Sequence, residues 1–270
     1  MAHSQILLDG RIGDDLFEVM NAWVRHLPGG LAIATILACA FFAAITGSGA
    51  ATAATIGMVA YPAMTDRGYD KRFTLGLLAA GGTLGILIPP SVILVLLGDV
   101  LSNAYQQAQL KQGIYAPKTV AVGDLFSGAL IPGMVLVALY LVYILWTAWR
   151  HPERAPAIPA AERSAIGPSD LIKALVAPLG LILAALGSIL YGFATPTEAA
   201  AVGAVGAMVL AAGRGTLSRD MLAGVAQTTA KLSSMAFMLL FGASVFILVF
   251  RGLGGDVDAR PDGALGRAPS

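Results

Sequence analysis

Small and hydroxyl-bearing residues interrupt two of the most apolar parts of the sequence, and their types and spacing could support chemistry. The first interruption is Thr46-Gly47-Ser48-Gly49, and the second is the stretch AAGGTLGILIPPS. Secondary transporters interrupt helices at mid-membrane, where freed carbonyl oxygens coordinate Na⁺ and helix N-termini face anionic groups. Four hydroxyls would add oxygen ligands here, those of Thr46, Ser48, Thr52 and Thr83. One interpretation of the pattern is therefore an ion site.

A plainer interpretation needs no ion. Glycine and alanine let neighbouring helices approach closely in lipid, and such small-residue patterns are common packing devices. Two interruptions close together in the chain favour a site over packing alone.

The composition indicates a membrane protein. Hydrophobic residues make up 57% of the chain and charged residues 12%, with a mean hydropathy of +0.76, whereas soluble domains are roughly 25% charged. The 17 basic and 16 acidic residues nearly cancel, so no basic field is present to attract nucleic acid. We therefore predict an all-α integral membrane protein that contacts the lipid bilayer and does not bind nucleic acid.

Six stretches carry no charge, and four of them have the roughly 20 residues needed to cross a bilayer. They are residues 31–61, 73–98, 125–149, 174–197, 199–213 and 232–250. The first stretch is too long for one span and is split near its middle, so each arm is too short to cross. We predict a re-entrant hairpin over 31–61, with its tip at Thr46-Gly47-Ser48-Gly49.

The rest of the first region, residues 1–149, follows from the same pattern. An amphipathic segment precedes the hairpin, and residues 73–98 read as a helix broken at Gly81-Gly82 and again at Pro89-Pro90. The polar segment 99–124 suits an outward-facing loop or an interfacial helix. Residues 125–149 then form a transmembrane helix.

The segments beyond residue 149 form a second region. Residues 150–170 carry Arg150 and Arg154 and are rich in proline and alanine, which predicts a cytoplasmic linker. Transmembrane helices follow over 171–253. The last residues, 254–270, have no apolar periodicity and are expected to be disordered.

Glu198 is the lone acidic residue of its apolar surroundings. A carboxylate within a membrane is a candidate for ion or proton binding. Thr195-Pro196-Thr197-Glu198 also matches a capping box, in which the glutamate reaches back to the N-cap amide. We favour the capping interpretation.

An enzyme is the alternative from another class, because Gly47-Ser48-Gly49 faintly resembles the serine motif of intramembrane proteases. A serine nucleophile needs a base within hydrogen-bond reach. The histidines, at positions 3, 26 and 151, lie in polar or interfacial segments, and the apolar stretches contain no lysine. The sequence therefore does not indicate an enzyme.

Longer motifs carry a resemblance to a known family. FFAAITGSGAATAATIGMVAYPAMTDRGYDKRFTLGLLAAGGTLGILIPPS and YGFATPTEAAAVGAVGA closely resemble the large membrane subunit of tripartite ATP-independent periplasmic (TRAP) transporters, over about residues 6 to 256. The resemblance implies an elevator-type carrier of inverted repeats, with 171–253 as the start of the second repeat. It also implies Na⁺ as the coupling ion, no tightly bound cofactor, a small membrane subunit and a periplasmic binding protein as partners, and a multi-pass location in the inner membrane.

Carried onto this sequence, the resemblance implies a sodium site where the hairpin tip faces the glycine-rich helix. Its residues would be Gly47, Ser48, Gly49, Thr52, Gly81, Gly82 and Thr83. The implied cargo is a small organic acid, and the substrate-binding residues are not specified.

The chain also departs from the family pattern. A complete large subunit has further helices before the first hairpin and a second hairpin in the later repeat. We expect a product truncated at both ends, with out-of-frame translation from Asp256 onward. Two alternatives stay open: another Na⁺-coupled carboxylate symporter, and a membrane fragment without transport activity.

Overall fold

The computed structural model describes residues 12–24, 26–157, 168–213 and 215–255, and this part of the chain is helical without strands. Its helices are α2 Ile12–Val24, α3 Gly30–Thr46, α4 Gly49–Thr65, α5 Lys71–Leu87, α6 Val92–Lys111, α7 Val122–Arg150, α8 Pro168–Leu190, α9 Pro196–Gly213 and α10 Arg219–Gly252. The prediction of an all-α membrane protein is confirmed. The described residues do not include the N-terminal residues, part of the linker or the tail from Asp256. The expectations of a disordered tail and of out-of-frame translation from Asp256 therefore concern residues outside the described part.

The predicted hairpin consists of α3 and α4, with its tip at Gly47 and Ser48. Gly47 has a left-handed φ of 60° and donates its N–H to the carbonyl of Ala43, which ends α3. This conformation costs any residue with a Cβ about 1–2 kcal/mol. Ser48 is the N-cap of α4, and its hydroxyl accepts a hydrogen bond from the amide of Ala51 at 3.4 Å. The chain therefore reverses at the predicted place.

The expected break at Gly81-Gly82 is wrong, because α5 continues through both glycines to Leu87. Glycine costs only about 1 kcal/mol relative to alanine inside a helix, which close packing can offset. The break at Pro89-Pro90 is observed. There α5 and α6 meet at a bend of 40°, and the Ser91 hydroxyl caps α6 by accepting from the amide of Leu94 at 3.5 Å.

The polar segment 99–124 is helical over its first half, so the loop expected there is shorter. Gln, Ala and Leu are all good helix formers, and α6 therefore extends to Lys111. The Gln109 side chain fastens the loop that follows, donating to the carbonyl of Lys118 at 2.9 Å and accepting from its amide at 3.0 Å.

Among the described residues, three helices are long and apolar enough to cross a membrane, namely α7, α9 and α10, and the bent pair of α5 and α6 is a fourth candidate. The capping box at the start of α9 is confirmed. Glu198 accepts from the Thr195 amide at 2.8 Å, and the Thr195 hydroxyl accepts from the Glu198 amide at 3.3 Å. The small residues of α9, from Ala199 to Ala211 at every fourth position, are buried as a packing face.

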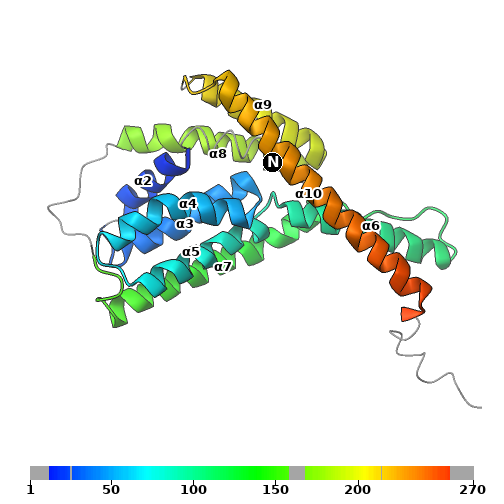
Figure 1. Cartoon of the computed structure of the whole chain (residues 1–270), viewed down its shortest axis with the longest axis horizontal. Coiled ribbons are helices and arrows are strands. Elements are labelled where there is room, and N and C mark those ends of the chain that lie inside the picture. Colours follow the sequence, from blue (N-terminus) through cyan, green and yellow to red (C-terminus); the bar gives the residue numbers. More distant parts are fainter. Residues whose placement is uncertain (1–11, 25, 158–167, 214, 256–270) are drawn as a thin grey trace, which may run out of the picture.

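The helices pack in two groups (Figure 1). The larger core joins α2, α3, α4, α5 and α7, and α3 is buried along most of its length. The second group pairs α8 with α9. Of α10, Val225 is the buried residue, and Figure 1 shows this helix projecting away from the larger core.

Glycine allows α4 and α5 to touch main chain to main chain. A Cβ on Gly49 would lie 2.7 Å from the carbonyl oxygen of Gly82, and one on Gly85 would lie 2.6 Å from the carbonyl oxygen of Ser48. A Cβ on Gly47 would collide with the carbonyl oxygen of Pro90. The hairpin tip is thus held against the α5–α6 break by contacts that a larger residue would prevent.

We expect Gly47→Ala to lower stability by at least about 1–2 kcal/mol, because alanine must adopt a left-handed φ and also displace the Pro90 carbonyl. Gly128→Ala is the matched control. Gly128 lies in α7, where an added Cβ would have no neighbour within 4 Å, so this variant should be neutral or slightly stabilising. Thermal unfolding of both variants in detergent, followed by circular dichroism, checks the difference. Equal melting curves would show that the tip tolerates a side chain.

Candidate functional site

The two interrupted elements meet, so that the candidate site lies where the hairpin tip fits against the α5–α6 break. The amide of Val92, the first residue of α6, donates to the carbonyl of Gly47 at 3.4 Å. Pro90 cannot donate a hydrogen bond, and its carbonyl faces the tip. The freed main-chain groups of the tip and of the break therefore lie against each other, where protein supplies contacts that lipid cannot.

Three oxygen atoms cluster just behind the tip. The hydroxyls of Thr46 and Thr52 are 3.0 Å apart. The Ser48 carbonyl lies 2.9 Å from the Thr52 hydroxyl and 3.4 Å from that of Thr46. Thr46 and Thr52 are buried, with exposed fractions of 4% and 0%. Hydroxyl and carbonyl oxygens are the donor type that hard cations take in proteins, so this donor set is chemically suited to a small cation such as Na⁺.

The seven residues expected at the sodium site do not all face the same way. Gly47, Ser48, Gly49 and Thr52 belong to the tip, and Gly82 lies against Gly49 across the helix interface. Gly81 instead faces α3, where a Cβ would lie 2.7 Å from the sulfur of Cys39.

Thr83 lies on yet another side of α5. Its hydroxyl donates to the carbonyl of Ala80 at 2.7 Å and is 3.2 Å from the hydroxyl of Tyr140 on α7. The structure therefore does not bring Thr83 together with the tip. These residues are close together in the sequence. The helical twist nevertheless turns successive residues of α5 toward different neighbours.

A cavity of about 120 Å³ opens beside the tip. Its lining comes from the tip, the break, α6, α7, α8 and α9, namely Thr46, Gly47, Pro90, Ser91, Val92, Val95, Phe126, Ala185, Ile189, Pro196, Ala199, Ala200 and Gly203. None of these side chains is charged. The first residues of α6 and α9 are part of the lining, and helix N-termini carry partial positive charge.

Sequence reasoning missed Ser91 and the contribution of α9 to this cavity. Ser91 is 1% exposed and directly follows Pro89-Pro90, so the break itself was the available signal. No sequence pattern connects α9 to the hairpin, because the contact joins residues more than 100 positions apart. In the described part of the chain, no three His, Cys, Asp or Glu side chains gather as a metal site.

Comparison with known proteins identifies the family of the chain. The family model for the tripartite ATP-independent periplasmic transporter, DctM component, matches residues 3–257. The C4-dicarboxylate TRAP transporter large permease protein DctM of Rhodobacter capsulatus is 32% identical over 237 residues, which is 87% of this chain and 51% of that protein.

Of two further relatives, one is again named for C4-dicarboxylates and the other for a different solute. The C4-dicarboxylate TRAP transporter large permease protein DctM of Pseudomonas aeruginosa is 39% identical over 73% of this chain and 41% of its own length. The ectoine/5-hydroxyectoine TRAP transporter large permease protein UehC of Ruegeria pomeroyi is 31% identical over 92% of this chain and 51% of its own length. The chain thus spans about half the length of these relatives. With the match extending over nearly all of its residues, the chain belongs to the DctM family of TRAP transporter large permease components.

Proposed function

We propose that this chain contributes to the permease of a Na⁺-coupled transporter that imports small organic acids across the inner membrane. The observation that carries the proposal is the buried oxygen cluster of Thr46, Ser48 and Thr52 at the tip of the hairpin. The cluster offers oxygen ligands for a cation, and none of these ligands carries a formal negative charge. A small membrane subunit and a periplasmic binding protein are the proposed partners. We do not propose an enzymatic activity for the chain.

The cluster and the adjacent cavity suggest how ion and solute are linked. A Na⁺ ion held by the two hydroxyls and the Ser48 carbonyl would fix the tip and add positive charge next to the cavity. The N-termini of α6 and α9 add partial positive charge to the cavity lining. An anionic solute would then bind more favourably with the ion present, which is the requirement for coupling.

Thr52→Val should weaken Na⁺ binding about tenfold or more, because it removes one oxygen at nearly constant volume and hydrogen bonds to charged groups contribute about 1.5–3 kcal/mol. The measurement is the rise in thermal unfolding temperature of the purified chain on replacing choline chloride with NaCl.

Thr35→Val is the matched control for this substitution. Thr35 is equally buried in the same hairpin, and its hydroxyl also bonds to the carbonyl four residues earlier, at 2.8 Å. This variant should keep the response to Na⁺. A full response in Thr52→Val, or an equal loss in both variants, would remove the cluster from consideration as the ion site.

We further expect Na⁺-dependent uptake by proteoliposomes that contain this chain, its small membrane subunit and the binding protein loaded with an organic acid. Replacing Na⁺ by choline should reduce the initial rate about tenfold or more, because the solute would enter only with its coupling ion. A full-length relative assayed in parallel controls for the reconstitution. Activity of the relative alone, with none from this chain, would identify the chain as a membrane segment without a transport cycle.

A further inference from the structure

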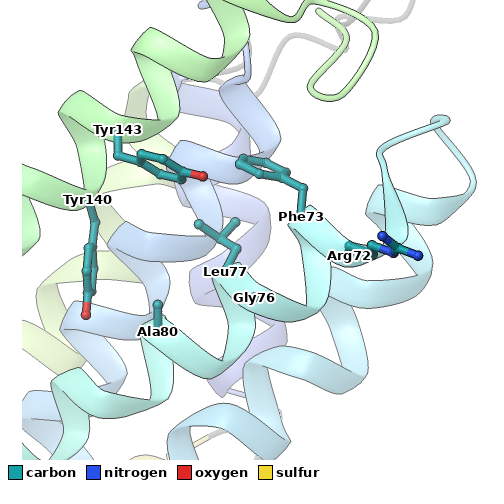
Figure 2. A pocket seen from close by; sticks show the side chains of 7 residues that line it. All are labelled: Arg72, Phe73, Gly76, Leu77, Ala80, Tyr140 and Tyr143. Atoms are coloured by element: carbon teal, nitrogen blue, oxygen red, sulfur yellow. The ribbon is translucent and has the colours of Figure 1, made fainter.

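A second cavity, of about 340 Å³, lies between α5 and α7 on a different side of α5 from the hairpin tip. Its lining is formed by Arg72, Phe73, Gly76, Leu77, Ala80, Tyr140 and Tyr143, shown in Figure 2. We call it the α5–α7 groove. It shares no residue with the cavity at the tip, and its volume falls within the range of small-molecule sites.

The groove has one charged end and one uncharged end. Figure 2 shows Arg72 at one end, beyond Phe73, with Ala80 and Tyr140 at the other. Ala80 follows Arg72 by eight positions, which corresponds to about 12 Å along the helix axis. The lining between them is mostly hydrocarbon. This distribution of polarity fits an amphiphilic ligand with an anionic head.

The charged end lies at the level where headgroups are expected. The ring of Phe73 is 6.4 Å from that of Tyr143, which is in turn 6.5 Å from the ring of Trp146. Trp149 and Arg150 follow at the end of α7, and Trp149 is 79% exposed. Aromatic residues beside basic ones mark the cytoplasmic interface of a membrane protein.

Arg72 has no acidic partner of its own. In the described part of the chain, no carboxylate lies within 4.0 Å of its guanidinium. Asp70, two residues before Arg72, accepts from the amide of Phe73 at 2.8 Å, and Glu153 pairs with His151 at 3.1 Å.

The start of α5 carries more basic than acidic side chains. Lys71 and Arg72 open α5 directly after its N-cap residue Asp70, whose carboxylate accepts the hydrogen bond from the Phe73 amide. One carboxylate therefore faces two cations and the positive end of the helix dipole, so the start of α5 can attract a further anion.

We propose that the α5–α7 groove binds one anionic phospholipid, with its phosphate at Arg72 and an acyl chain along Gly76, Leu77 and Ala80. The membrane supplies this ligand at high local concentration, and α7 is long and apolar enough to cross it. Recognition rests on the charge of the headgroup, so a zwitterionic lipid should bind less well.

The test compares lipid retention by the full chain. The purified protein is placed in nanodiscs of equal phosphatidylglycerol and phosphatidylcholine, extracted into mild detergent, and examined by native mass spectrometry. We expect phosphatidylglycerol to be retained in preference to phosphatidylcholine. Arg72→Gln should weaken its binding about fivefold, the usual effect of one basic residue near an anionic surface, and Arg72→Lys should largely restore it.

Two matched controls separate the groove from general effects. Lys71→Gln removes a neighbouring charge that does not line the groove, and it should retain the lipid. Gly76→Leu fills the groove, and Gly128→Leu adds the same side chain to α7 outside it; neither glycine has a neighbour within 4 Å of an added Cβ. The first should abolish retention and the second should not.

Circular dichroism must show unchanged helix content in every variant compared. Equal retention of the two lipids would overturn the headgroup assignment. Retention unaffected by both Arg72→Gln and Gly76→Leu would overturn the site itself. These outcomes are independent of Na⁺ binding, because Thr52→Val tests the oxygen cluster at the hairpin tip, which lies on a different side of α5 from the groove.

Discussion

The close approach of the hairpin tip to the α5–α6 break is the contact on which the described structure depends. A broken helix leaves amides and carbonyls without helical partners, and the interior of a bilayer supplies no water to satisfy them. Here the two breaks are placed against each other, with the Val92 amide bonded to the Gly47 carbonyl. One contact thereby reduces the cost of leaving main-chain groups unpaired at both breaks. It also creates a polar site inside an apolar protein.

Glycine makes this contact geometrically available. Gly49, Gly82 and Gly85 bring the main chains of α4 and α5 within the distance that a single Cβ would occupy. The same closeness leaves the Thr46 and Thr52 hydroxyls buried beside the Ser48 carbonyl. Packing and chemistry are therefore not competing explanations of the small residues, since the glycines provide the packing and the hydroxyls provide the oxygens.

Much of this arrangement could be predicted from the sequence because it depends on local rules. The tip at Gly47 and Ser48 follows from a left-handed glycine and a capping serine, and the break at Pro89-Pro90 follows from the missing amide of proline. The break expected at Gly81-Gly82 is absent because a glycine pair weakens a helix without ending it, and tertiary contacts decide the outcome. The cavity lining from α9 depends on contacts distant in sequence, which local patterns do not encode.

Helix α5 faces three different environments, and substitutions on it must be interpreted face by face. Gly82 lies against α4, Gly81 against the Cys39 sulfur of α3, and Thr83 against Tyr140 of α7. A Cβ on Gly82 would lie 2.8 Å from that of Ala53, so Gly82→Val would separate the helices before it could report on an ion. Thr52→Val changes the oxygen cluster at nearly constant volume, and Gly76→Leu changes the α5–α7 groove without a steric clash. These two positions distinguish an effect on ion binding from an effect on lipid binding, whereas the glycines between the helices report on packing.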